Sequence, residues 1–186
     1  EVFAGSPEAD AASTEALILG QALGVGAGQL SDLFLTRGIY LTTAERRPEA
    51  VAHFREGARL AEQADDNLRL GGVLLNLADA VAVTDPAAGA EAARTAAEHL
   101  RRAGAQDYLQ LATTNLFQAL LQLGDWDAAE EELTRALDSD GLTDGGYLSC
   151  CRGWLAALRG DVATAETILA GLADLRASED PQDKAL

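Results

Sequence analysis

Three glycines at alternate positions, in the stretch LGVGAGQLSD from Leu23 to Asp32, could form a loop that cradles a phosphate. A dinucleotide-binding loop of this kind follows a β-strand and has a third glycine three residues after the second. That position holds Gln29, and the preceding segment has the periodicity of a helix. We therefore predict that the stretch is a turn between helices, and that replacing Gly26 with alanine has little effect beyond local turn strain.

Cysteine and histidine are common metal ligands, and each occurs twice in the chain. Cys150 and Cys151 are adjacent, and adjacent residues on a helix diverge by about 100°, so these thiols cannot easily bridge each other. We predict two free thiols in a reducing cytoplasm. His53 and His99 are far apart in the sequence and belong to no HxxxH or HExxH motif, so we predict solvated or partly packed histidines and no metal site.

Acidic, hydroxyl and arginine residues complete the set of candidate chemical groups. The three glutamates at 130–132 point in different directions around a helix, which is typical of a solvated face near a helix N-terminus. Ser149 lacks the glycine-flanked elbow of a serine nucleophile. The tripeptide Arg159-Gly160-Asp161 matches an adhesion motif only in its letters, because its glycine and aspartate read as a turn and a helix cap. The sequence predicts no catalytic residue, no cofactor, and a protein that is not an enzyme.

The composition favours an all-α protein that avoids polyanions. Of the 186 residues, 48% are hydrophobic and only 5% aromatic, and alanine, the best helix former, is abundant. The formal net charge is -16 and Lys184 is the only lysine, so nucleic acid and anionic membranes are poor partners. No apolar run approaches the roughly 20 residues that span a bilayer. We expect a soluble, cytoplasmic domain excised from a longer bacterial protein.

The chain repeats itself, which is the sequence signature of a solenoid. A shift of 40 residues places Leu60 on Leu100, and a shift of 36 places Gly124 on Gly160. Within each unit, apolar residues recur every three and four positions through two successive helices, which are separated by proline, glycine or aspartate. Each unit is therefore predicted to be a helical hairpin. The predicted segments are a leading helix at 7–28, four repeats at 31–66, 71–106, 110–141 and 146–177, and a tail at 178–186.

These hairpin units resemble tetratricopeptide repeats. The third unit, LFQALLQLGDWDAAEEELTRAL at 116–137, is the best match, and the second departs from the pattern at Arg94, where a large apolar residue is usual. The matching positions are Phe34, Gly38, Leu41, Ala50, Phe54 and Gly57, then Leu77, Ala78, Val81, Ala90 and Ala97, then Leu116, Leu120, Gly124, Trp126, Ala129, Leu133 and Ala136, then Gly153, Gly160, Ala165 and Leu169. The resemblance implies an all-α, right-handed superhelical solenoid of antiparallel hairpins. It extends to the arrays of large bacterial regulators, in which an ATPase or cyclase core precedes a sensing array.

In tetratricopeptide arrays the first helix of each hairpin lines a concave binding face. Carried over to this sequence, the lining residues are Asp32, Leu35, Thr36, Ile39, Leu75, Asn76, Asp79, Thr114, Asn115, Gln118, Cys150, Cys151 and Trp154. Asn76 and Asn115 occupy equivalent places and resemble the asparagines with which some members hold peptide main chain, although asparagine also serves helix packing there. None of the lining residues is basic, so a partner's terminal carboxylate is disfavoured and the expected partner is a neutral, apolar or basic segment.

The sequence thus predicts a protein- or peptide-binding scaffold within a larger bacterial signalling or transcriptional regulator. The alternative is a sensor array that binds a small diffusible ligand and relays its closure to an attached ATPase or cyclase. A deep pocket near Cys150 and Trp154 would favour the sensor, and a groove past Thr36, Asn76 and Asn115 would favour peptide binding. Trp154 is either an exposed anchor or an indole covered by a further hairpin. A third reading is self-association through the open ends of the array.

Overall fold

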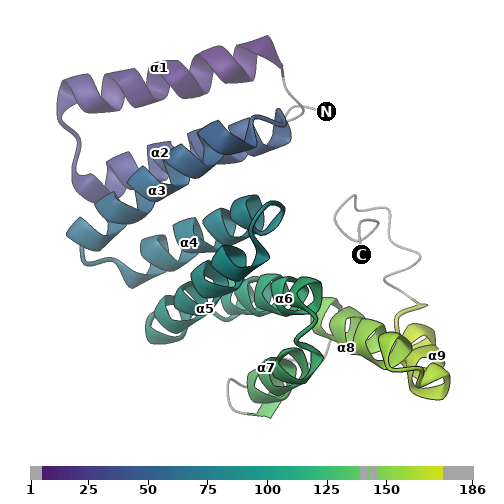
Figure 1. The fold of residues 1–186 in the computed structure, drawn as a ribbon. Helices are drawn as coiled ribbons and strands as arrows, with labels where there is room; N and C mark the ends of the chain where they lie inside the picture. Colours follow the sequence, from purple (N-terminus) through teal and green to yellow (C-terminus); the bar gives the residue numbers. More distant parts are fainter. Residues whose placement is uncertain (1–5, 139–141, 143–145, 174–186) are drawn as a thin grey trace.

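The computed structural model describes residues 6–138, 142 and 146–173, and within these ranges every regular element is an α-helix. The helices are α1 (Pro7–Leu23), α2 (Ala27–Thr43), α3 (Arg47–Gln63), α4 (Asn67–Ala82), α5 (Pro86–Ala103), α6 (Gln106–Leu123), α7 (Trp126–Asp138), α8 (Tyr147–Leu158) and α9 (Val162–Gly171). The predicted all-α solenoid class is confirmed (Figure 1). None of the described helices is both long and apolar enough to cross a bilayer. The predicted tail at 178–186 lies outside the described residues.

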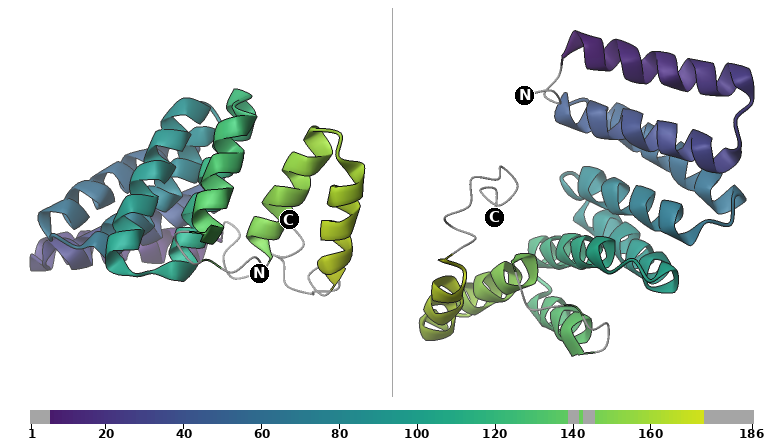
Figure 2. Two further views of the ribbon diagram at one scale, coloured as in Figure 1. Left: turned by 90° about the horizontal axis from the view of Figure 1, so that it is seen from below. Right: turned by 180° about the vertical axis from the view of Figure 1, so that it is seen from behind.

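Consecutive helices pack as hairpins, α2 with α3, α4 with α5, α6 with α7 and α8 with α9, while α1 packs on α2 (Figure 1). The helices α2, α4, α6 and α8 also contact one another in succession. Successive members of α3, α5, α7 and α9 make no comparable contact among the described residues. Helices that touch along a curved stack lie on its inner side, so we call α2, α4, α6 and α8 the concave row. Figure 2 shows the same stack from below and from behind.

Local sequence sets the turns between helices. Helix α5 begins at Pro86, whose fixed φ suits a first helical position, behind Asp85, whose side chain accepts a hydrogen bond from the N–H of Ala88 at 3.0 Å. Gly124 and Gly160 have φ angles of 77° and 80°, and the aspartate after each glycine caps the next helix. The 36-residue sequence repeat therefore corresponds to a repeated turn geometry.

Several helix boundaries differ from the predicted bounds of the repeats. Helix α1 ends at Leu23 rather than at residue 28, because Gly24, with φ of 65°, closes it in the left-handed region. Helix α2 begins at Ala27 rather than at residue 31, directly behind Gly26. Gly24 to Gly26 thus form the predicted turn between helices, whereas Gly28 lies in the first turn of α2. Helix α4 likewise begins early, at Asn67 rather than at residue 71.

Small side chains let the hairpins approach closely. Helix α5 buries four alanines and Leu100, and the main core cluster runs from α4 through α8. Arg94, which stands at a usually apolar position of the repeat, lies at the surface in an ion pair with Glu91 at 3.3 Å. The departure from the repeat pattern at Arg94 therefore leaves the packing of α5 intact.

A buried arginine holds α1 on α2. Arg37 of α2 is 8% exposed, and its guanidinium forms an ion pair with the carboxylate of Asp10. The same group donates hydrogen bonds to the backbone oxygen of Asp10 at 3.1 Å and to Ser13 Oγ at 2.9 Å, and it lies 5.1 Å from the ring centre of Tyr40. These partners compensate a charge that would otherwise be costly to bury.

Candidate functional site

The concave row presents most of the predicted binding residues to solvent. On each helix these residues recur at spacings of three or four, so they form one strip per helix. The exposed members are Asp32, Thr36, Ile39, Asp79 and Trp154, and the half-buried members are Leu35, Asn76, Asn115, Gln118 and Cys150. The four strips lie on helices that contact one another in sequence, so they form a continuous wall.

Leu75 and Thr114 were expected on this wall, and the structure corrects both to core positions. They are 7% and 5% exposed. Leu75 belongs to the main core cluster, and Thr114 Oγ1 donates a hydrogen bond to the backbone oxygen of Gln110 at 3.0 Å. Cys151 is buried in the same way. Each of these residues is adjacent in sequence to a residue of a strip. Adjacent residues of a helix point about 100° apart, so the side chain points into the core instead of toward solvent.

Both asparagines of the wall use an amide donor inside the fold. Asn115 Nδ2 donates to the backbone oxygen of Leu75 at 3.2 Å and thereby joins α6 to α4. Asn76 Nδ2 donates to the backbone oxygen of Gly72 at 2.8 Å, within its own helix. Among the described residues neither Oδ1 has a partner, so the group that each asparagine offers to a ligand is a hydrogen-bond acceptor.

Exposed apolar side chains extend the strips toward the helix N-termini, and sequence reasoning missed these residues. Leu111 lies one helical turn before Asn115, and Leu68 lies two turns before Asn76, so each lies on the same helix face as its asparagine. The spacing of four residues was the signal that could have found them. The exposed apolar residues of the concave row include Ile39, Leu68, Tyr108, Leu111 and Trp154.

The charge of the wall is acidic or neutral. Arg69 reaches it from α4, but its Nε donates to both carboxylate oxygens of Asp32 at 3.0 and 3.1 Å, and its Nη1 pairs with Asp66. These two carboxylates, Asp32 first, raise the pKa of Arg69, and the backbone N–H and guanidinium of Arg69 lower the pKa of Asp66. Asp79 forms no ion pair with any described residue. A carboxylate ligand is therefore disfavoured, and a cationic group is compatible with the wall.

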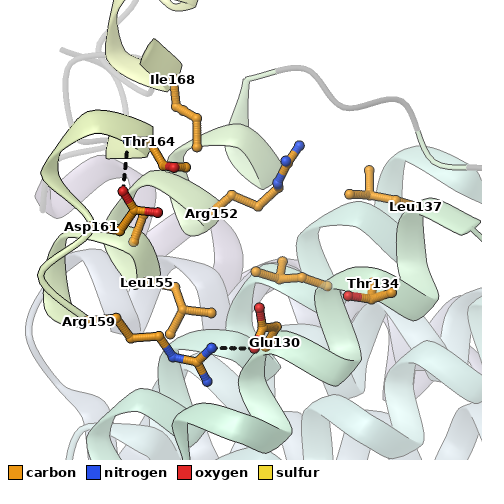
Figure 3. Close-up of a pocket in the computed structure, with 11 residues that line it drawn as sticks. Glu130, Thr134, Leu137, Arg152, Leu155, Arg159, Asp161, Thr164 and Ile168 are labelled. Atoms are coloured by element: carbon orange, nitrogen blue, oxygen red, sulfur yellow. Dashed lines mark hydrogen bonds and ion pairs between the residues drawn. The ribbon is translucent and has the colours of Figure 1, made fainter. Parts of the chain in front are cut away.

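A cavity of about 330 Å³ lies away from the strips, where α7 meets α8 and α9 (Figure 3). Leu133 and Leu155 form part of its apolar lining. At its edge the guanidinium of Arg159 is ion-paired with Glu130 and, at 2.6 Å, with Asp127. Two carboxylates already compensate this charge, so Arg159 offers no anion site and its place in the adhesion-like tripeptide is structural.

A second cavity, of about 230 Å³ and mostly apolar, lies between α8 and α9. Cys150 and Trp154 line it from α8, and Ala165 and Leu169 line it from α9. A pocket near Cys150 and Trp154 is thus present. It is an open one, because Trp154 and Leu169 are 51% and 50% exposed.

The two cysteines are free thiols in weakly reactive surroundings. Burial raises the pKa of Cys151 to about 12 and also raises the pKa of Cys150. A nucleophilic or metal-binding cysteine needs a lowered pKa, so neither thiol is suited to those roles.

The histidines make local contacts. His53 Nδ1 lies 2.9 Å from the backbone oxygen of Glu49, and His99 Nδ1 lies 2.8 Å from Asn67 Oδ1. Across the described ranges, no group of three or more histidine, cysteine, aspartate or glutamate side chains could hold a metal ion.

The fold and its wall define a class, an all-α stack of helical hairpins with a concave row of exposed side chains. The crystal structure of BtubC (BKLC) from P. vanneervenii is similar to this chain, with a TM-score of 0.77 and 17% sequence identity over 91% of this chain and 72% of that one. At this identity the likeness shows the fold alone. No protein-family model and no curated protein matches the chain.

Proposed function

We propose that this chain is a non-catalytic module that binds a protein or peptide through its concave row, within a larger cytoplasmic bacterial signalling or transcriptional regulator. The supporting observation is the wall of exposed strips on four successive helices, which carries an apolar anchor on each helix. The regulator context rests on the resemblance to tetratricopeptide arrays.

A segment with apolar and basic side chains is the partner that this wall fits best. Exposed Ile39, Leu111 and Trp154 offer apolar contacts on three of the helices. Asp79 offers an exposed carboxylate without an ion pair to any described residue, and asparagine Oδ1 atoms can accept hydrogen bonds from the main chain of an extended peptide. Nucleic acid is disfavoured, because the formal net charge is -16.

Selection from a random-peptide library, with the domain immobilised, tests this proposal. We expect the selected peptides to be enriched in arginine, lysine and large apolar residues. Their binding should be weakened at least about tenfold by Asp79→Lys, because a like charge in the wall repels a basic peptide. Glu62→Lys is the matched control, since Glu62 is also exposed but lies on α3, outside the concave row, and the change in net charge is identical.

Two outcomes would contradict the proposal. Equal loss of binding in the two variants would mean that net charge, and not the wall, governs capture. Selected peptides that are acidic, or that bind normally to the Asp79→Lys variant, would place the binding surface elsewhere.

The second candidate function is a sensor for a small diffusible ligand. The cavity of about 230 Å³ beside Cys150 and Trp154 favours it, because its lining is mostly apolar and includes an aromatic side chain. A metabolite screen by thermal shift tests this candidate, with Trp154→Ala as the variant that should abolish any stabilisation.

A further inference from the structure

One glycine of the concave row has no packing role in the fold. Glycine is, after proline, the least favourable residue inside a helix, so its cost must be offset by some other gain. At Gly38 and Gly71 the gain is close packing. A Cβ atom at Gly38 would lie 2.3 Å from Phe54 Cε1, and one at Gly71 would lie 2.6 Å from Leu100 Cγ. Gly72 lies inside α4, yet nothing is within 4 Å of a Cβ atom built there, so packing does not explain it.

Gly72 belongs to the α4 strip of the wall. It lies one helical turn before Asn76, whose Nδ2 donates to the backbone oxygen of Gly72 at 2.8 Å. In the sequence repeat, Gly72 corresponds to Asp32 of α2 and to Leu111 of α6, and both of these helices contact α4. The wall therefore lacks a side chain at a place where the helices on both sides carry one. We use the name glycine gap for this open space over Gly72, with Leu68 and Leu111 as its apolar neighbours.

The glycine gap favours a large apolar side chain. Leu68, one turn before Gly72, is 47% exposed, and Leu111 is 37% exposed, so both offer hydrocarbon contacts at the surface. The nearest charge on the α2 side is that of Asp32, and Arg69 compensates it through hydrogen bonds at 3.0 and 3.1 Å. A further charged group would therefore find no unpaired counter-charge beside the gap.

The two sides of Asn76 can read two neighbouring residues of a peptide. Asn76 Oδ1 can accept a hydrogen bond from a main-chain N–H that points at the wall. In an extended peptide the side chains are perpendicular to the N–H direction, and successive side chains point in opposite directions. A peptide that crosses α4 toward Asn115 of α6 therefore directs one side chain along α4 toward Gly72. The next side chain points toward Asp79, an exposed carboxylate three residues after Asn76 on the same strip.

We propose that Gly72 and Asp79 together select a partner segment in which a large apolar residue is directly adjacent to an arginine or lysine. Gly72 admits the apolar side chain, and Asp79 pairs with the basic one. This inference rests on the proposed function, because it assumes that an extended peptide binds in the concave row.

Parallel selections from one random-peptide library test the proposal, with the unaltered domain, Gly72→Leu and Gly171→Leu as baits. Gly171→Leu is the matched control, because nothing lies within 4 Å of a Cβ atom at Gly171, and this residue lies on α9 outside the concave row. We expect the unaltered domain and Gly171→Leu to select peptides with a large apolar residue beside an arginine or lysine. Gly72→Leu should still select basic peptides, but with small residues beside the basic one, because the introduced leucine fills the gap.

Affinities measured by fluorescence anisotropy add a magnitude. One labelled peptide from the selection on the unaltered domain should bind at least about tenfold more weakly to Gly72→Leu and within about twofold to Gly171→Leu. The same peptide with alanine in place of its apolar residue should bind the unaltered domain and Gly72→Leu equally, since the coupled pair is then already broken. Circular dichroism checks that both variants are folded.

The outcomes separate this inference from the proposed function. If the unaltered domain selects no basic peptides, the proposed function fails and the selectivity of Gly72 fails with it. If all three baits select basic peptides with the same neighbouring residues, or if Gly72→Leu binds the labelled peptide as tightly as the unaltered domain does, peptide binding stands and the role of Gly72 is refuted. Equal weakening by Gly72→Leu and Gly171→Leu would also refute it.

Discussion

Replacing Gly38 with alanine should destabilise the first hairpin, although alanine is the better helix former. A Cβ atom at Gly38 would lie 2.3 Å from Cε1 and 2.6 Å from Cδ1 of Phe54. Such contacts are ordinarily no closer than about 3.4 Å, so the ring would have to move by about 1 Å. Phe54 is 1% exposed and packs in a core cluster with Leu41 and Val73, which leaves it little room.

The magnitude follows from two opposing contributions. Overpacking of a filled core costs about 1–3 kcal/mol, and the exchange of glycine for alanine inside a helix contributes about 1 kcal/mol in favour of folding. Gly72 isolates the second contribution, because nothing lies within 4 Å of a Cβ atom built there. We therefore expect Gly72→Ala to stabilise the protein, Gly38→Ala to destabilise it, and the two free energies of unfolding to differ by about 1–3 kcal/mol.

Urea unfolding followed by circular dichroism at 222 nm measures both variants beside the unaltered chain. In thermal unfolding, a difference of about 1–3 kcal/mol in the free energy of unfolding should separate the melting temperatures of the two variants by roughly 3–10 °C. Hydrogen exchange of the α2 and α3 amides adds a local measurement, since hairpin arrays unfold in segments. Equal or greater stability of the Gly38→Ala variant relative to Gly72→Ala would refute the packing assigned to Phe54.

Three further predictions concern other parts of the array. Burial raises the pKa of Cys151 to about 12 in the folded state, so a thiol reagent should modify Cys150 first. For the same reason the free energy of unfolding should fall as the pH rises from about 9 toward 12. Modification of Cys151 at the rate of Cys150 would contradict this. Arg37→Met should cost about 1–3 kcal/mol and speed hydrogen exchange in α1 while leaving α5 unchanged, since α1 depends on that guanidinium. Glu45 has φ of 60°, so Glu45→Gly should raise the melting temperature by about 2–4 °C, and a lowered value would show that the turn relaxes without strain.

The hairpin architecture was predictable because its signals are local. Asp85 and Pro86 indicate a helix start, because aspartate caps a helix and proline has a fixed φ. Gly124 and Gly160 indicate turns in the left-handed region. Neither signal depends on distant parts of the chain. The same local chemistry gave the glycine stretch its role as a turn. Helix starts were less predictable, because Gly26 ends the turn before the first large apolar residue of its helix.

The details of the wall depend on the phase of each helix and on contacts between distant residues. Leu75 and Thr114 are each adjacent in sequence to a residue of the wall. When the apolar face of a helix is broad, its periodicity does not show which of two adjacent residues points to solvent. The pairing of Arg69 with Asp32 joins residues of different hairpins, so no local pattern announces it. The cavities depend on the distances between neighbouring helices. These distances are set by side-chain packing between the helices and cannot be read from the sequence of either helix alone.

The most direct test of the central claim is an NMR titration of the isotope-labelled domain with one peptide from the library selection. We expect the shifts to concentrate in the strips of the concave row. The side-chain amide signals of Asn76 and Asn115 and the indole N–H signal of Trp154 should be among those that move. Shifts confined to α3, α5 and α7 would contradict this, because the peptide would then bind helices outside the concave row.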